Sequence, residues 1–151
     1  METDAAVWQV KSFSELSTQQ LYKILQARID VFVVEQNCPY PETDGYDDKA
    51  LHLWAEKNGE IAAYCRIFAA GIKYEVPSIG RVLTTEKFRG QNFGKGLIKI
   101  AVDIVETRFN TTQIQISAQD YLLKFYQEFG FQSTGNSYLE DDIPHTEMRR
   151  N

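Results

Sequence analysis

The chain has 151 residues and a formal net charge of −5, with 43% hydrophobic and 25% charged residues. This length and apolar fraction suit a single globular domain over residues 1–151 and argue against a disordered chain. The negative charge disfavours nucleic acid as a partner, and the lack of an 18-residue apolar run predicts no membrane contact. At the start of the chain, Met1–Asp4 lack the basic and apolar pattern of a secretory signal, so we expect a cytoplasmic protein.

A short strand over residues 8–13 and then an amphipathic helix are the first predicted elements. Ser17 and Gln20 have the spacing of a capping box, and apolar residues then recur at helical spacing to about Val34. Arg28 falls within this apolar stripe, and Glu35 lies seven residues later at a similar angular position. The two charges are either a structural ion pair at the edge of the core or part of a substrate or catalytic cleft.

Residues 36–49 predict a loop, because they contain two prolines, one glycine and four acids without periodicity. The acids do not have the spacing of an EF-hand, so we expect no metal site and a solvated loop. A second interpretation is that the loop flanks the cleft, where its charge would favour a protonated amine. Cys38, in this loop, and Cys65 have neither disulfide nor metal-site spacing and are expected to be inert, buried thiols.

Residues 51–56 and 61–68 predict a β-hairpin, because the Asn58-Gly59 pair between them suits a type I′ turn. His52 and Arg66 lie on these two strands. His52 is a candidate base or substrate ligand, although a histidine on a strand is more often structural. Arg66 could bind a substrate carboxylate together with Arg28, or it could pair with Glu35.

The remaining pattern predicts a strand over 76–84, a helix over 94–109, a strand over 113–117, a helix over 119–129 and a last strand within 138–149, interrupted near Pro144. This order predicts the α/β (α+β) class, with a mixed, mostly antiparallel sheet flanked by helices. Exposed edge strands of such a sheet can pair, so a homodimer is compatible with the sequence.

A glycine-rich turn between the fourth strand and the second helix predicts an anion site. It reads Arg89-Gly90-Gln91-Asn92-Phe93-Gly94-Lys95-Gly96 and would present backbone N–H groups at a helix N-terminus. The P-loop is excluded, because Gly90 and Gly94 are too close and no Ser or Thr follows Lys95. The GxGxxG dinucleotide fingerprint is absent as well.

The pattern Gln-x-x-Gly-x-Gly at Gln91, Gly94 and Gly96 resembles the acetyl-CoA loop of the GCN5-related N-acetyltransferase (GNAT) superfamily. Residues 125–131, Phe-Tyr-Gln-Glu-Phe-Gly-Phe, resemble a later helix of the same superfamily. Residues 31–40, 117–119 and 138–145 are similar to its ElaA-like branch, so the resemblance spans nearly the whole chain. Asn92, Gln119 and Leu122 depart from the common pattern, in which many members have Gly, Asn and Ala.

The resemblance implies a GNAT fold, acetyl-CoA as co-substrate, no metal, and acetyl transfer to a primary amine of a small molecule or a protein. Tyr126 would be the general acid, and a backbone N–H at Leu83 or Thr84 would bind the oxyanion. Glu35 is the first candidate for the base, with His52, His145 or water as alternatives. The expected cofactor-binding residues are Val82, Leu83, Thr84, Arg89, Gly90, Gln91, Asn92, Phe93, Gly94, Lys95, Gly96, Gln119 and Tyr126. The expected substrate-binding residues are Arg28, Glu35, His52 and Arg66.

Two other functions remain open from the sequence. One is a non-catalytic acyl-CoA-binding module, against which the retained Tyr126 argues. The other is an acyltransferase like the acyl-homoserine-lactone synthases, suggested by the Val-Phe-x-x-Glu-Gln segment that begins at Val31.

Overall fold

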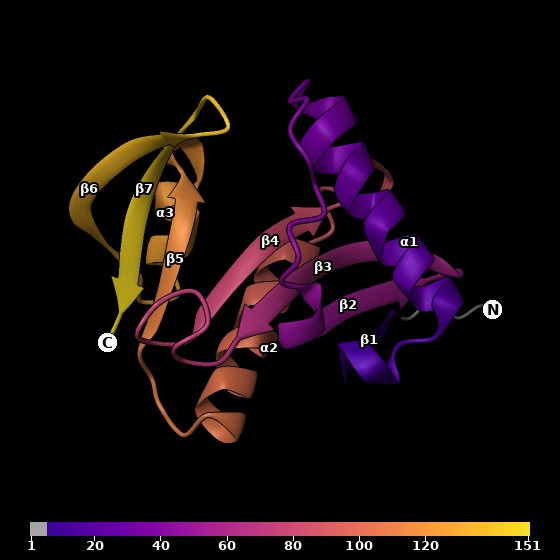
Figure 1. Ribbon diagram of the computed structural model, residues 1–151, viewed down its shortest axis with the longest axis horizontal. Coiled ribbons are helices and arrows are strands. Elements are labelled where there is room, and N and C mark those ends of the chain that lie inside the picture. Colours follow the sequence, from indigo (N-terminus) through magenta and orange to yellow (C-terminus); the bar gives the residue numbers. More distant parts are fainter. Residues whose placement is uncertain (1–5) are drawn as a thin grey trace.

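Seven strands form one mixed sheet in the computed structural model, which describes residues 6–151 (Figure 1). The strand order is β1-β2-β3-β4-β5-β7-β6, and all neighbours are antiparallel except β4 and β5. The predicted fold class is therefore confirmed. The strands are β1 Val7–Ser12, β2 Leu51–Lys57, β3 Glu60–Phe68, β4 Ser78–Thr84, β5 Ile114–Gln119, β6 Gln132–Glu140 and β7 Ile143–Arg150.

Helices α1 (Thr18–Arg28) and α2 (Phe93–Arg108) cover opposite faces of the sheet (Figure 1). The alternation of β2 and β3 explains this arrangement, since successive side chains point to opposite faces. Trp54 and Tyr64 pack in the cluster of α1, whereas Leu53 and Cys65 pack in the cluster of α2. The centre of the sheet, at β2 and β3, is therefore buried on both sides, whereas β6 is exposed along most of its length.

The strands separate between β4 and β5. Within residues 6–151 these two parallel strands are paired at a single position, Ser78 with Gln115, and they then diverge (Figure 1). A bulge in β4 adds to the separation, because Arg81 inserts an extra residue opposite β3 and takes a left-handed φ of 50°. From the bulge to its end, β4 thus has one edge without a strand partner.

The first helix has the predicted extent but not the predicted type throughout. Its capping box is confirmed, because Ser17 Oγ accepts from the Gln20 N–H and Gln20 Oε1 accepts from the Ser17 N–H. After Arg28 the chain continues as a π-helix, Ile29–Glu35, with five-residue hydrogen bonding. The change in period moves Glu35 away from Arg28, so the expectation that the two share one angular position is wrong.

The C-terminal segment differs most from the prediction. It is a hairpin of β6 and β7 rather than one strand, and its turn is Asp141-Asp142, both with positive φ. Pro144 does not interrupt the strand, because it lies in β7 one residue before pairing with β5 begins at His145. The helix expected over 119–129 is reduced to α3, Leu123–Gln127, after a 3₁₀ turn over 120–122.

Candidate active site

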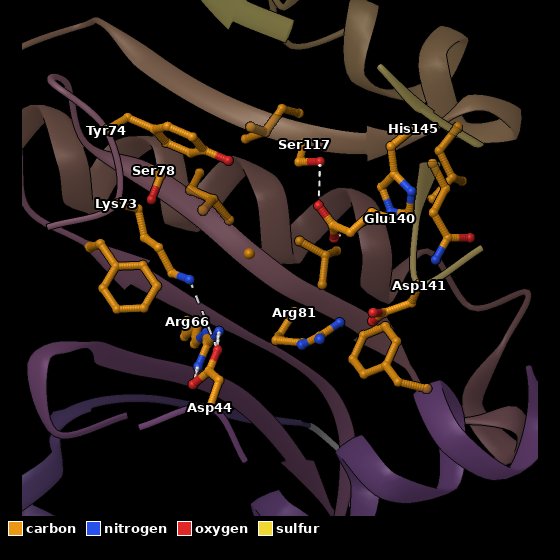
Figure 2. A pocket seen from close by; sticks show the side chains of 18 of the residues that line it. Asp44, Arg66, Lys73, Tyr74, Ser78, Arg81, Ser117, Glu140, Asp141 and His145 are labelled. Atoms are coloured by element: carbon orange, nitrogen blue, oxygen red, sulfur yellow. Dashed lines mark hydrogen bonds and ion pairs between the residues drawn. The ribbon is translucent and has the colours of Figure 1, made fainter. Parts of the chain in front are cut away.

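Two cavities meet in the gap between β4 and β5. The loop cavity, about 580 Å³, extends from the end of β4 to Arg89 and Gly94 of the glycine turn. The hairpin cavity, about 360 Å³, extends from β4 to the β6–β7 turn (Figure 2). Because the two share part of their lining, they form one path through the gap. The shared residues are Phe32, Val82, Gln119, Leu122 and Tyr126.

The glycine turn leads directly into α2, whose N-terminal N–H groups lack helical partners. Gly90 and Asn92 both have positive φ, 82° and 64°, so the turn needs residues that tolerate this conformation. Asn92 therefore serves where many GNAT proteins have glycine. Gly94 lines the loop cavity, whereas a Cβ on Gly96 would lie 3.2 Å from the Trp8 ring. Packing against Trp8 thus explains the glycine at 96.

The other predicted residues of the turn lie beside the loop cavity rather than in its lining. Gln91 accepts a hydrogen bond from Lys57, and Lys95 lies 3.5 Å from Glu128. Phe93 packs into the core against Trp8. Of residues 89–96, the side chain of Arg89 and the backbone at Gly94 face the cavity most directly.

The end of β4 presents its free edge to both cavities. Leu83 pairs with Tyr64, and Thr84 with Ala63, on the β3 side. On the other side β5 has already diverged, so backbone groups of Val82–Thr84 that do not bond to β3 are available to a ligand, except the Thr84 carbonyl, which accepts from Arg89 Nε at 3.0 Å.

Tyr126, on α3, lies where the two cavities meet. Its side chain packs against Phe125 and Phe131 and is 6% exposed. Burial raises the pKa of Tyr126 well above its usual value, so the phenol is protonated at neutral pH. Its hydroxyl makes no hydrogen bond within the part of the chain that the structure describes, which leaves the proton free for a ligand.

Glu35 lines the loop cavity and is held by Arg89. The guanidinium donates two hydrogen bonds to its carboxylate, at 2.9 and 2.7 Å. These bonds lower the pKa of Glu35 and raise that of Arg89. The alternatives that paired Glu35 with Arg28 or Arg66 are therefore wrong.

Acids of the 36–49 loop bind Arg28 and Arg66 instead. Arg28 is fully buried and donates to Glu42 at 2.9 Å and to Asp47 at 2.7 Å. Arg66 donates to Asp47 at 2.9 Å and binds Asp44 through two nitrogens. The expectation of a solvated loop is wrong for these three acids, because buried guanidinium groups need counter-charges and the loop supplies them.

Arg28 and His52 lie outside the linings of these cavities, although both are expected substrate ligands. His52 is fully buried, with Nδ1 2.6 Å from the Tyr64 hydroxyl and Nε2 2.9 Å from the Asp47 carbonyl. Burial lowers the pKa of His52. The structure thus places both residues in supporting positions, while Arg66 lines the hairpin cavity.

Most polar groups of the hairpin cavity were not predicted as site residues. These groups come from the segment before β4, from β4 and β5, and from the β6–β7 turn. They are Lys73, Tyr74, Ser78, Arg81, Ser117, Glu140 and Asp141. His145, considered as a base, does line this cavity. The segment 138–145 carried a signal through its resemblance, whereas Lys73 and Tyr74 lie in a loop without pattern.

Residues 6–151 contain no cluster of three or more His, Cys, Asp or Glu side chains arranged to hold a metal ion. None of their helices has the length and apolar character needed to cross a membrane. Cys38 and Cys65 are both buried and unpaired, as expected.

Comparison with known proteins identifies relatives over nearly the full chain. Residues 12–151 match the family model described as the acetyltransferase (GNAT) domain. Protein ElaA of Escherichia coli K12 is 41% identical over 145 residues, which cover 95% of each chain. The crystal structure of an acyl-CoA N-acyltransferase from Pseudomonas aeruginosa superimposes with a TM-score of 0.93 at 39% identity, covering 97% of this chain and 100% of that one.

The fold is also similar to that of BjaI, a CoA-dependent acyl-homoserine lactone synthase. The TM-score is 0.79 at 16% identity, covering 96% of this chain and 82% of the synthase. At this identity the likeness concerns the fold alone.

Proposed function

The chain belongs to the GNAT acetyltransferase family, and on that premise we propose that it transfers an acetyl group from acetyl-CoA to a primary amine. The observation that carries the proposal is the junction of two cavities at Tyr126. The loop cavity would hold the thioester donor and the hairpin cavity the amine. A reaction between two substrates needs them to meet at one point, and the gap between β4 and β5 supplies that point.

The loop cavity has the features that an acyl-CoA requires. N–H groups at the start of α2 and the Arg89 guanidinium would bind the pyrophosphate. The free edge of Val82–Thr84 offers backbone partners for the amide groups of the pantetheine arm. Gln119 lines the cavity on the β5 side, where its side chain can contribute a further polar contact.

Direct transfer requires the amine nitrogen to attack the thioester carbonyl. The new C–N bond forms, the C–S bond breaks, and the ammonium proton must first leave, since amines of this kind have a pKa near 10.4. We assign the oxyanion to the N–H of Leu83 or Thr84, on the free edge of β4. Tyr126 would donate its proton to the departing thiolate, a role that its place at the meeting point of the two cavities supports.

Glu35 and His145 are the two residues that could accept the proton of the amine. Glu35 could serve only after Arg89 releases it, because the two hydrogen bonds stabilise its charged form and weaken it as a base. His145 lines the hairpin cavity, and its Nδ1 donates to the Ile143 carbonyl at 2.7 Å. In the tautomer that donates from Nδ1, Nε2 is the acceptor. We therefore place His145, directly or through water, ahead of Glu35.

Acetyl-CoA binding is the first test. At 100 times its dissociation constant, a ligand stabilises the folded state by about 2.7 kcal/mol, which corresponds to a rise in Tm of about 5–10 °C for a domain of this size. Adenine nucleotides without the pantetheine arm should raise Tm much less. A Tm that saturating acetyl-CoA does not change would contradict both the enzyme and a non-catalytic acyl-CoA-binding module.

Catalysis by Tyr126 is the second test. Tyr126→Phe should lower kcat by about 10²- to 10⁴-fold and leave the affinity for acetyl-CoA within a few-fold, because only proton donation is lost. Tyr22→Phe is a matched control, since Tyr22 is 72% exposed on α1. A binding module would show the Tm shift but release no CoA with any amine.

A further inference from the structure

Charged groups are separated between the two ends of the hairpin cavity. Figure 2 shows Lys73, Tyr74 and Ser78 at one end. Glu140 and His145 lie at the other end, together with Asp141. His145 pairs in register with Gln119, which lines both cavities, so the acidic end is the one next to the junction.

Lys73, at the basic end, lacks a close counter-charge. Within residues 6–151, the loop acids Glu42, Asp44 and Asp47 already pair with Arg28, Arg66 and Arg81. Lys73 has the weakest contact, 4.0 Å to Asp44, whose carboxylate Arg66 already binds through two nitrogens. The Lys73 ammonium instead lies 3.9 Å from the centre of the Tyr46 ring. Burial lowers its pKa, as expected for a cation without a full counter-charge.

Two hydroxyl groups next to Lys73 lack partners. Ser78 is 4% exposed and lines the cavity, as does Tyr74. Neither hydroxyl makes a hydrogen bond within residues 6–151, and neither is among the fully buried atoms without a partner, so both are open to a ligand in the cavity. Burial also raises the pKa of Tyr74 to about 12, so its hydroxyl is a donor at neutral pH. An anion at this end would satisfy Lys73, Tyr74 and Ser78 together.

The acidic end has the groups to receive an ammonium. The Glu140 carboxylate accepts from Ser117 Oγ at 3.1 Å, and it lies 3.6 Å from His145 Nε2. That separation is too long for a direct hydrogen bond. An ammonium group placed beside both can donate to the carboxylate and, in the tautomer that donates from Nδ1, to Nε2.

We propose that the acceptor is a small amino acid in which an extended chain separates the primary amine from a carboxylate. This inference rests on the proposed function, since it names the substrate of the same transfer. The carboxylate would bind Lys73, Tyr74 and Ser78, and the amine would lie between Glu140 and His145, next to Tyr126.

Charge and size both favour this class. The single Lys73 ammonium, whose ion pair is 4.0 Å long, matches one carboxylate, whereas a phosphate monoester carries about −1.5 to −2. Ser78 marks the end that would bind the carboxylate, and Val82 marks the junction of the two cavities. The two residues are four strand residues apart, at most about 13 Å. Subtracting about 3 Å for the hydrogen bond between Ser78 and the carboxylate leaves roughly 10 Å for the length of the ligand. The 360 Å³ volume is near the lower end for small-molecule sites and does not suit a folded protein.

Four amines of equal chain length test the proposal: 6-aminohexanoate, hexylamine, 1,6-diaminohexane and 6-aminohexyl phosphate. The assay is CoA release from acetyl-CoA. We expect kcat/KM for 6-aminohexanoate to exceed that for hexylamine by about tenfold or more, since a charge-assisted contact is gained. The diamine should be the poorest acceptor, and the phosphate should be poorer than the carboxylate.

Variants at Lys73 locate the effect. Lys73→Met should remove the advantage of 6-aminohexanoate over hexylamine through KM, while Lys73→Arg should retain much of it. Lys49→Met is the matched control, because the Lys49 ammonium lies 5.3 Å from the same Tyr46 ring and is likewise exposed, but Lys49 is outside the cavity lining.

The outcomes separate this inference from the proposed transfer. Equal use of hexylamine and 6-aminohexanoate, or a Lys73→Met variant that keeps the preference, overturns the acceptor class and leaves acetyl transfer intact. If acetyl-CoA raises Tm but no amine releases CoA, the transfer itself fails. Calorimetry with 6-aminohexanoate then decides about the site: binding that Lys73→Met abolishes supports it, and no binding overturns it.

Discussion

Glu35→Gln separates two roles of the carboxylate that Arg89 holds. The substitution keeps the shape of the side chain and removes its charge. If Glu35 occupies the guanidinium that would bind the pyrophosphate, the variant should bind acetyl-CoA more tightly. If Glu35 is the base, acetyl-CoA affinity should stay the same and kcat should fall by about 10²-fold or more.

The expected gain in affinity follows from Coulomb's law. A phosphate oxygen bonded to the far side of the guanidinium would lie about 7 Å from the carboxylate, given two hydrogen bonds of about 2.8 Å. Repulsion over that distance is about 0.6 kcal/mol in water and about 2.4 kcal/mol at an effective dielectric of 20. The side chains of Arg89 and Glu35 are 45% and 31% exposed, so the smaller figure is the better guide. We expect about 0.5–1 kcal/mol, or 2- to 5-fold tighter binding.

Calorimetric titration with acetyl-CoA at low and physiological salt measures this gain, which added salt should reduce. Glu60→Gln is the matched control, because it breaks another exposed ion pair, with Lys87 at 2.7 Å, and changes the net charge equally. Unchanged or weaker binding by Glu35→Gln refutes the competition argument. A large loss of kcat with unchanged affinity returns Glu35 to the role of base.

Three further predictions concern the turn and the buried charges. Gly94→Ala should alter stability by less than about 1 kcal/mol, because the new Cβ would be 3.6 Å or more from its neighbours. If acetyl-CoA contacts the backbone at Gly94, the variant should bind it more weakly; an unchanged affinity together with an unchanged Tm would contradict that contact. Asp47→Asn should lower the free energy of unfolding in urea by about 3–5 kcal/mol, because it weakens two buried ion pairs. Asp48→Asn, at an exposed position, is the control and should be neutral. Equal effects of the two substitutions would refute the role of the buried pairs. Burial alone would raise the pKa of Asp44, but hydrogen bonds from Arg66 outweigh it and hold that pKa below its usual range. The Asp44 carboxylate should therefore stabilise the fold above its unfolded-state pKa of about 3.9, and this contribution should be lost as the pH falls below that value. The free energy of unfolding of Asp44→Asn should accordingly depend less steeply on pH between pH 4 and 2 than that of the wild type.

Local patterns predicted the central elements well, because each of them has a signal within a few residues. The Asn58-Gly59 pair adopts the two positive φ angles of the expected hairpin turn. The capping box at Ser17 and the glycine turn before α2 also lie where the sequence places them. Periodicity could not predict the π-helix, because a change from four- to five-residue hydrogen bonding leaves a similar apolar stripe.

Partners of charged groups were the weakest part of the prediction. Arg28, Arg66 and Glu35 were correctly noticed as unusual, but each has a different partner from those considered. The partners lie 14–54 residues away, on a loop without periodicity and on the glycine turn. No local spacing carries that information. For the same reason, a sequence without its fold could not place Lys73 opposite Glu140.

The single pairing of β4 with β5 has a mechanical consequence. The ladders β1–β4 and β5–β7–β6 are each continuously hydrogen-bonded, but one residue pair joins them. A rotation of one ladder against the other therefore breaks few backbone hydrogen bonds, whereas deforming either ladder breaks many. The width of the gap is therefore held by side-chain packing more than by strand pairing, because one apolar cluster spans both ladders and α2. Acyl groups longer than acetyl would then have to be accommodated by repacking this shared core, with the strand pairing inside each ladder preserved.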